Sequence, residues 1–406
     1  MLQYLGDWLE HGNLVSAILA FAGQGLLPEE KISQKQKTMR VTFILTSYSR
    51  KPIGGFRVVY EYANRLVKRG YRVNIVYCKR LKNIPESLGP LKRLKSEIYY
   101  LYKILFKPKP DWQLIDSRIK TFHVPEPEAR YIPEADAVFA TYWAIAEYME
   151  KYPEEKGRKC YLFQHYETFG SKDTGEVAAT WLSSFPKIII SKWLYDIGLS
   201  FNAKDMVYIP NGIDHDHFKM TAAIKDRPAR VAMMYSEIPW KGAWDGISAI
   251  DLAKKQFPDL QAVLFGVGKR ARDIPSWIEY RENPGQKELS ESIYNYSSIC
   301  LCPSHTEGFA LPPAEAMSCG CAVATTDCGG IKDFCQNEKT ALISPVRQPE
   351  ALAKNLIRFL EDDGLRIKIA QAGYDYIQRF SWENSLDLME NFLKKYGNAE
   401  SFNSNS

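Results

Sequence analysis

Two glutamates eight positions apart are the residues of this chain most suited to chemistry. Glu307 and Glu315 flank a Gly-containing loop that leads into a predicted helix opening with Pro312-Pro313. Proline is tolerated best in the first turn of a helix, so we expect Glu315 to lie within that turn. Each carboxylate offers two acceptor oxygens to neighbouring hydroxyls. The pair could therefore hold a sugar nucleotide, with Glu315 on a ribose and Glu307 on the transferred sugar.

The loop between these glutamates could bind a diphosphate through its backbone. A helix begins with unpaired N–H groups and a partial positive charge, which attract anions. An alternative interpretation remains open, in which Glu307 is a solvated loop residue and Glu315 an acid favoured by the helix dipole. The amides that we expect to face the phosphates belong to Gly308, Phe309, Ala310 and Leu311.

A lysine and two adjacent glycines occupy positions at which parallel sheets bind ligands. Gly54-Gly55 follows the first predicted strand, and Lys241-Gly242 follows the first strand of a second series, so both lie at carboxyl ends of strands. Adjacent glycines let a phosphate approach the backbone, and an ammonium could neutralise a departing diphosphate. The alternatives are an ordinary strand-to-helix turn and a solvated lysine.

Strands alternate with helices along most of the chain, and amphipathic stretches such as 56–69 separate the longest strands. This alternation predicts parallel α/β sheets, here in two Rossmann-like domains that face a central cleft. The turn sequence at 209–214 marks the boundary between them. The strands are expected at 41–46, 71–78, 137–141, 160–165, 187–191, 206–209, 231–235, 261–266, 298–302, 322–326 and 341–344.

These segments resemble the retaining glycosyltransferases of the GT-B fold known as family 4. Residues 307–315 match the Glu-x7-Glu motif of that family, 209–214 match its Pro-Asn-Gly-hydrophobic-Asp segment, and 54–76 match its Gly-Gly to Arg-Gly-His-x-Val opening, with Tyr71 in place of the histidine. Gly329-Gly330 with Asp333 resembles a further family segment, which we expect to serve packing.

The resemblance implies transfer of a sugar from a nucleoside diphosphate sugar to a hydroxyl of a glycan, lipid-linked glycan, glycopolymer or protein, for example in cell-surface polysaccharide biosynthesis. Retention would follow from same-face attack, in which the leaving phosphate takes the acceptor's proton. No metal or other cofactor is implied, and Asp214-x-Asp216 is discounted as a metal motif because it belongs to the interdomain turn.

The resemblance also assigns the residues that act on the donor. Glu307, Lys241 and His165 would be catalytic, with His165 at the end of the strand 160–165 facing the donor sugar. A histidine in a structural hydrogen bond is the alternative. The donor would be bound by Gly54, Gly55, Lys241, Gly308, Phe309, Ala310, Leu311 and Glu315.

One position departs from the family pattern. Similar enzymes carry an arginine six residues before the lysine, and here that residue is Tyr235. A guanidinium is a permanent and often bidentate phosphate ligand, so either another base such as Arg270 or Arg272 replaces it or the donor is handled differently. The departure keeps a second class open, a catalytically silent subunit that binds an acceptor or a partner transferase. A phosphorylase or a sugar-nucleotide epimerase of the same fold is a third option.

The resemblance divides the chain into four parts. Residues 1–38 form an extension that could be a docking helix, an oligomerisation element or a start assigned too far upstream. Residues 39–208 form the acceptor-side domain, completed by about 375–396, and 209–374 form the donor-nucleotide domain. The helical region 365–396, with Ser381 as an N-cap, is expected to return to the first domain. Residues 397–406 are small and polar, and are expected to be disordered.

Composition indicates a cytoplasmic globular protein. The eight cysteines are scattered, several in apolar runs, and are expected to be buried reduced thiols. The Cys-x-Cys pairs at 300–302 and 319–321 are one residue short of the usual zinc spacing. No stretch approaches the ~20 apolar residues of a membrane span.

Basic charge is concentrated between residues 79 and 109, which hold nine Lys or Arg against two Glu. Within this segment leucines and isoleucine recur at helical spacing beside three tyrosines. Such a helix could lie on an anionic membrane, at the inner face of the cell, or bind an anionic acceptor. It could equally pack through its leucines with a charged outer face. Nucleic acid is disfavoured because no recognised binding module accompanies the charge.

Overall fold

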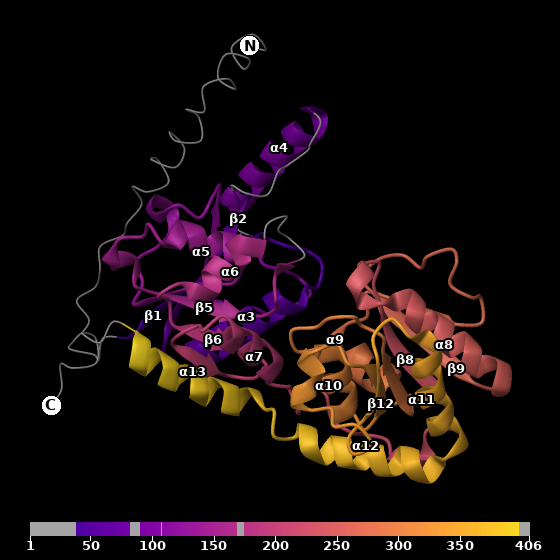
Figure 1. Ribbon diagram of the computed structural model, residues 1–406. Helices are drawn as coiled ribbons and strands as arrows, with labels where there is room; N and C mark the ends of the chain where they lie inside the picture. The colour runs from indigo at the N-terminus through magenta and orange to yellow at the C-terminus, as the bar shows by residue number, and fades with distance from the viewer. Residues whose placement is uncertain (1–37, 82–89, 107, 169–173, 398–406) are drawn as a thin grey trace. The chain divides into compact units, whose positions relative to one another are not determined.

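The computed structural model describes residues 38–81, 90–106, 108–168 and 174–397, without the side chains of 90–94 and 174 (Figure 1). Residues from Met39 onward form one compact unit. The expectations for the extension before Thr38 and for the tail after Gly397 lie outside the described residues.

The first domain is built on a seven-stranded sheet in which every pairing is parallel, in the order β3-β2-β1-β4-β5-β6-β7. Its central strands are buried on both faces, which explains their unbroken apolar sequences. The strands are β1 Arg40–Leu45, β2 Arg72–Cys78, β3 Lys120–Val124, β4 Ala137–Ala140, β5 Arg158–Phe163, β6 Lys187–Ile189 and β7 Met206–Tyr208.

The second domain holds a six-stranded parallel sheet in the order β10-β9-β8-β11-β12-β13. Its strands are β8 Arg230–Tyr235, β9 Gln261–Gly266, β10 Glu279–Glu282, β11 Ile299–Cys302, β12 Ala322–Thr326 and β13 Leu342–Ser344. Two parallel sheets with helices around them confirm the predicted fold class. Several predicted strand ends differ from the observed ones by one or two residues, and one of these differences bears on the site. Strand β5 stops at Phe163, so His165 lies in the following loop and does not end the strand.

Helices connect the strands as parallel pairing requires. In the first domain they are α3 Gly54–Lys68, α4 Pro90–Phe106, α5 Trp143–Met149, α6 Thr174–Leu182 and α7 Lys192–Ser200. In the second they are α8 Ala243–Gln256, α9 Gln286–Glu288, α10 Leu311–Ser318, α11 Pro349–Glu361 and α12 Asp363–Ile377, followed by α13 Trp382–Tyr396.

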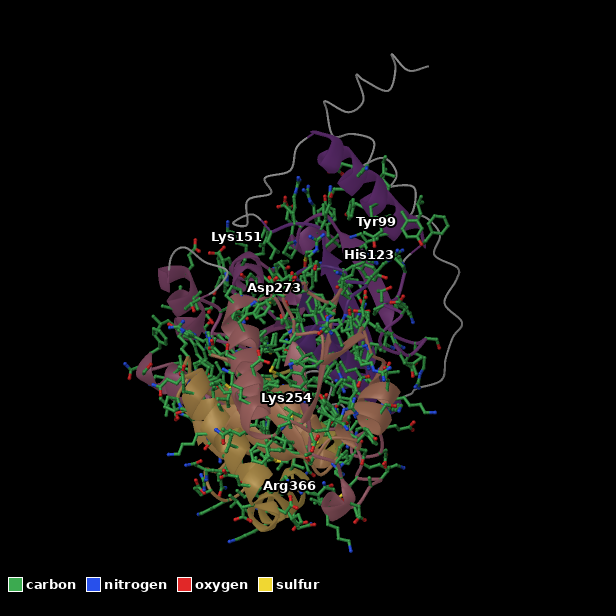
Figure 2. All side chains as sticks on the ribbon, turned by 90° about the vertical axis from the view of Figure 1, so that its right-hand side faces the viewer. Tyr99, His123, Lys151, Lys254, Asp273 and Arg366 are labelled. Carbon is green, nitrogen blue, oxygen red and sulfur yellow. The ribbon has the colours of Figure 1, made fainter. Side chains whose placement is uncertain are left out.

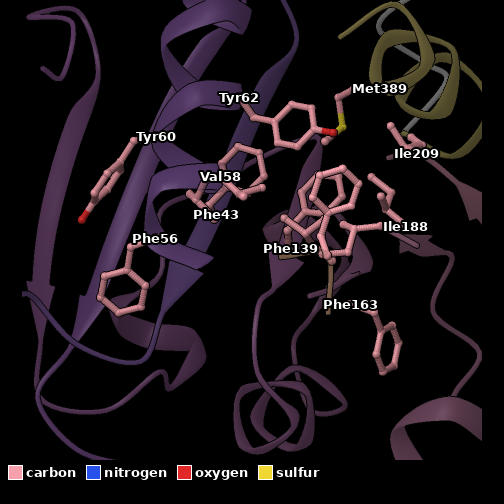
Figure 3. Packing of buried hydrophobic residues seen from close by; sticks show 14 of the residues in the cluster. Phe43, Phe56, Val58, Tyr60, Tyr62, Phe139, Phe163, Ile188, Ile209 and Met389 are labelled. Carbon is pink, nitrogen blue, oxygen red and sulfur yellow. The ribbon is translucent and has the colours of Figure 1, made fainter. Parts of the chain in front are cut away.

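The last helix returns to the first domain, as expected. Ser381 caps α13 by accepting a hydrogen bond from the amide of Asn384 at 3.2 Å. Met389 from α13 lies beside Tyr62 from α3 in the buried cluster of the first domain (Figure 3). Arg69, directly after α3, binds Glu383 at 2.9 Å, Asp387 at 2.5 Å and Glu390. One guanidinium thus holds three carboxylates of α13.

This three-carboxylate contact predicts a stability effect. Arg69→Ala should lower the free energy of unfolding by about 1–2 kcal/mol, more than a single exposed pair contributes, because it leaves three like charges unpartnered. Urea denaturation at low and high salt measures it, and the loss should shrink as salt screens the repulsion. Arg118→Ala, which removes an exposed pair with Asp116, is the control with little effect. An unchanged midpoint for Arg69→Ala would show that α13 is held by apolar packing alone.

Candidate functional site

Glu307 and Lys241 form a partly buried ion pair at the carboxyl end of the second sheet. The Lys241 ammonium lies 2.8 Å from each carboxylate oxygen of Glu307, and the Ser304 hydroxyl donates to Oε1 at 2.7 Å. Glu307 is only 7% exposed, so the interpretation of a solvated loop residue is wrong. The amide of Glu307 donates to the carbonyl of Cys328 at 2.8 Å, which fixes the loop against the strand-to-helix turn after β12. Ser304 was not predicted from the sequence. The one signal that could have found it is its position three residues before Glu307.

Glu315 is also buried, but its partner comes from the other domain. Counted from Leu311, Glu315 is the fifth residue of α10, so the expectation that it lies in the first turn is wrong. Its side chain is 4% exposed, and Arg57 Nη1 on α3 donates to its Oε1 at 2.5 Å. It is therefore not a solvated acid of a helix terminus either. No local sequence signal pointed to Arg57, which is 258 positions away.

The loop between the two glutamates has the backbone of an anion site. Ala310 caps α10 with φ 68° and ψ 72°, the left-handed region, and Pro312 and Pro313 occupy the first turn as expected. Within the part of the chain that the structure describes, the amides of residues 308–311 find no backbone or side-chain acceptor. Four successive N–H groups beside a helix N-terminus can bind phosphate oxygens.

Gln164 of the first domain joins this loop to the predicted glycine loop. A Cβ on Gly308 would lie 1.8 Å from the Gln164 backbone oxygen, so only glycine fits there. A Cβ on Gly55 would lie 3.3 Å from Oε1 of the same residue, whereas Gly54 faces open space within 4 Å. Gly54 and Gly55 are the first residues of α3, so two predicted donor loops, one from each domain, meet around Gln164. Gln164 was not predicted from the sequence.

His165 approaches the ion pair from the first domain. Its Nδ1 donates to the Tyr166 carbonyl at 2.9 Å, which makes Nδ1 the protonated nitrogen when the ring is neutral. Burial lowers the pKa of His165, and Lys241 acts in the same direction, whereas the Tyr166 carbonyl and Glu307 oppose the change. The structure thus brings together His165, Glu307 and Lys241, the three residues predicted to be catalytic.

Tyr235 fills the position of the missing arginine without supplying a charge. Its ring is buried and packs edge-on against Trp244 and Tyr280. Arg270 cannot replace the guanidinium, because its terminal nitrogens donate to the carbonyls of Ile274, Pro275 and Ile278. These contacts disfavour Arg270 among the alternatives, whereas Arg272 and a different handling of the donor stay open.

The eight cysteines are buried free thiols. In the described ranges no cluster of three or more His, Cys, Asp or Glu side chains is arranged to hold a metal ion. A polar cavity of about 410 Å³ lies next to the interdomain turn, between Arg65, Asp214 and Glu383, and its walls include none of the predicted site residues.

The second domain matches a known family. Residues 216–376 match the profile of the family described as Glycosyl transferases group 1, which agrees with the resemblance over this part of the chain. A phosphatidyl-myo-inositol mannosyltransferase of Mycobacterium tuberculosis H37Rv is 26% identical over 193 residues, 44% of this chain and 51% of the relative. A D-inositol 3-phosphate glycosyltransferase of Corynebacterium urealyticum is 33% identical over 102 residues, 25% of this chain and 24% of the relative. The chain thus spans about half or less of the length of these relatives.

Solved structures extend the fold comparison over both domains. Sucrose-phosphate synthase from Thermosynechococcus elongatus has a TM-score of 0.66 at 17% identity and covers 88% of this chain and 98% of its own. Anabaena HepE in complex with UDP has a TM-score of 0.64 at 15% identity and covers 88% of this chain and 100% of its own. Both confirm the GT-B fold.

A buried glutamate secures the loop that carries His165. Glu167 accepts hydrogen bonds from the Trp143 amide, which opens α5, and from the Tyr161 hydroxyl, both at 2.8 Å. Burial raises the pKa of Glu167 from 4.5 to about 8, although both donors oppose the change. Between these values the folded protein keeps a proton that the unfolded chain releases, so stability falls as pH rises through this window.

Glu167→Gln should remove that pH dependence, because glutamine stays neutral. In the wild type this group should lower the free energy of unfolding by up to about 1.4 kcal/mol per pH unit within the window. Denaturation curves at pH 5 and pH 9 measure the slope, with the exposed Glu155→Gln as control. The variant should gain stability over the wild type at pH 9 and not at pH 5. Equal slopes in both proteins would contradict the assignment.

Proposed function

We propose that this protein is a retaining, metal-independent glycosyltransferase that moves a sugar from a nucleoside diphosphate donor to a hydroxyl acceptor. The observation that carries the proposal is the partly buried Lys241–Glu307 pair, which lies beside four unpaired loop amides and faces His165 from the other domain. An ammonium and a row of amides match the charge of a diphosphate, the group on which negative charge grows during transfer.

Each site residue has a distinct task in this proposal. Lys241 and the amides of 308–311 bind the diphosphate, and the loop at Gly54-Gly55 closes over it from the first domain. Glu307 orients Lys241 and accepts a hydrogen bond from a hydroxyl of the donor sugar. His165 lies on the opposite side of that sugar, and because burial favours its neutral form with the proton on Nδ1, its Nε2 accepts a hydrogen bond from a sugar hydroxyl. Closure of the domains would exclude water and limit hydrolysis of the donor.

The names of the similar proteins support a choice of donors and acceptors to test. HepE was solved with UDP and with UDP-glucose, and the curated relatives are named for phosphatidyl-myo-inositol and inositol 3-phosphate acceptors. A uridine or other nucleoside diphosphate sugar and a lipid-linked or polyol hydroxyl are therefore the first candidates.

Turnover of a sugar-nucleotide panel tests the proposal. We expect release of nucleoside diphosphate with at least one donor, and Lys241→Met and Glu307→Gln should each lower kcat/KM by about 100-fold or more, the scale on which removal of one charge-stabilising group acts. Lys151→Met, on an exposed lysine of the first domain, should change nothing. Turnover that both site variants leave intact would contradict the assignment. Tight donor binding without turnover under every acceptor would instead support the silent-subunit class.

We also propose that the protein rests on an anionic membrane surface through α4. In the described part of the chain no helix is long and apolar enough to cross a bilayer. Helix α4 projects from the first domain (Figure 1). Its described side chains include Ile98, Leu105 and Phe106, which are 58%, 67% and 69% exposed. These residues do not pack inward, which disfavours the interpretation of a leucine-packed helix; Leu91 and Leu94 lie outside the described side chains.

Aromatic and basic groups lie next to these exposed side chains. Tyr99, marked in Figure 2, stacks on Tyr102, which in turn contacts Phe106. The Lys103 ammonium lies 4.6 Å from the Tyr99 ring centre, and Arg50 lies 5.7 Å from it. Apolar and aromatic side chains beside cations suit the interface of a bilayer with anionic headgroups.

Co-sedimentation with vesicles tests the membrane proposal. Wild-type protein should pellet with vesicles containing phosphatidylglycerol and much less with pure phosphatidylcholine. The triple change Ile98→Ser, Leu105→Ser and Phe106→Ser should abolish pelleting without lowering the melting temperature. Leu182→Ser, on an exposed leucine of α6, is the matched control that should still pellet. Failure of the wild type to bind, or equal binding by the triple variant, would contradict the proposal.

A further inference from the structure

Arg57 links the two domains at the end of the site where the ribose is expected. It lies in the first turn of α3, directly after the glycine loop, and its Nη1 binds Glu315 Oε1 in the second domain. Both side chains are largely buried, at 17% and 4% exposure. Arg57 therefore extends into the second domain and is not a surface cation.

Two further groups hold the guanidinium in place. It lies over the ring of Phe218, 5.3 Å from the ring centre. With its amide turned to satisfy its neighbours, Gln286 accepts hydrogen bonds from Nε at 3.2 Å and from Nη2 at 3.3 Å. A guanidinium that is stacked and hydrogen-bonded on several sides is preorganised for one geometry.

Glu315 needs this partner whether or not a donor is bound. An ionised carboxylate without a compensating charge is costly in a buried position. Ribose hydroxyls can donate hydrogen bonds to it, but they bring no positive charge. Displacement of Arg57 by a ribose would therefore leave the carboxylate uncompensated. The arginine must remain on Oε1, and within the described residues Oε2 has no hydrogen-bond donor and is left for the ligand.

We propose that Arg57 is a positioning residue for the donor: it holds Glu315 as a carboxylate in the orientation that binds the ribose, and it does so only while the two domains are together. The inference rests on the proposed function. It adds that the affinity for the nucleotide depends on a residue of the first domain, Arg57, even if that residue does not contact the nucleotide. Binding of the ribose would then be coupled to domain closure.

The electrostatic surroundings of Glu315 make this role measurable. Burial raises the pKa of Glu315, and the Arg57 guanidinium is the main group that opposes the rise. Without Arg57 the carboxyl would hold its proton to higher pH, so binding that needs the carboxylate would strengthen as pH rises. The other ionisable groups that face it are Glu61 on α3, His217 in the interdomain segment, Tyr294, Cys300 and Cys319.

Calorimetric titration of the nucleoside diphosphate that the wild type binds best, from pH 5.5 to 8.5, is the test. Arg57→Met should weaken binding at pH 6 by 10-fold or more, and the loss should shrink as pH rises. Arg57→Lys, which keeps the charge, should restore most of the affinity at pH 6. Arg65→Met is the matched control, since Arg65 lies on the same helix but pairs with Glu61 and Asp214. It should bind like the wild type.

A double-mutant cycle separates positioning from direct contact. Glu315→Gln alone should weaken binding without a pH trend, and adding Arg57→Met to it should weaken binding no further. The double variant leaves no unpaired charge at the Arg57–Glu315 contact. It should therefore remain folded and report on binding even if Arg57→Met alone unfolds. Additive losses, or wild-type affinity in Arg57→Met, would overturn the inference while leaving the proposed function standing. A wild-type protein that binds no nucleoside diphosphate would overturn the proposed function.

Discussion

Two buried carboxylates, Glu307 on the loop and Glu315 on the helix α10 that follows it, determine how the rest of this site is arranged. A carboxylate removed from water needs a cation or several donors to remain charged. Glu307 finds an ammonium and a hydroxyl within its own domain, from Lys241 and Ser304. Glu315 finds a guanidinium from the other domain, from Arg57. One end of the loop is therefore complete within the second domain, and the other end is completed only when the first domain contributes.

The close approach of backbones around Gln164 follows from the same arrangement. Arg57 and Gly55 lie in the same helical turn, so the contact with Glu315 also brings the glycine loop toward the second domain. Gly308 meets the Gln164 carbonyl at a distance that excludes any Cβ, and Gly330 packs against Gly308 on its other side. Small residues at these places let the free amides of 308–311 face a ligand from both domains. Tyr235 removes a cation at one edge of this region, and the pairing of Lys241 with Glu307 leaves the amides as the main remaining donors.

Local sequence patterns predicted most of the fold because most strands are central. The strand Gln261–Gly266 was predicted at its observed bounds, since its apolar run is enclosed by polar residues and glycine. The two strands that were missed, Lys120–Val124 and Glu279–Glu282, each lie at one edge of their sheet, and in them polar residues alternate with apolar ones or outnumber them. The end of β5 was placed two residues late because neither Gln164 nor His165 is a residue type that marks a turn. The order of strands in each sheet was not predictable from these patterns.

Some residues of the candidate site could likewise be predicted from local sequence, and others could not. Glu307, Lys241, His165 and the glycines stand next to strand ends, where the period of the sequence changes, and these could be found. Arg57 and Gln164 act through contacts with residues 258 and 144 positions away, and no periodicity or spacing encodes such a contact. The burial of Glu315 was likewise invisible, because its place on α10 made it look like an acid attracted to a helix terminus.

A structure of the protein with a bound nucleoside diphosphate would show whether Glu315 binds the ribose while Arg57 holds it. We expect phosphate oxygens on the amides of 308–311 and near the Lys241 ammonium, ribose hydroxyls on Oε2 of Glu315, and Arg57 still on Oε1. A nucleotide bound elsewhere, or a ribose that has displaced Arg57 from Glu315, would contradict this expectation.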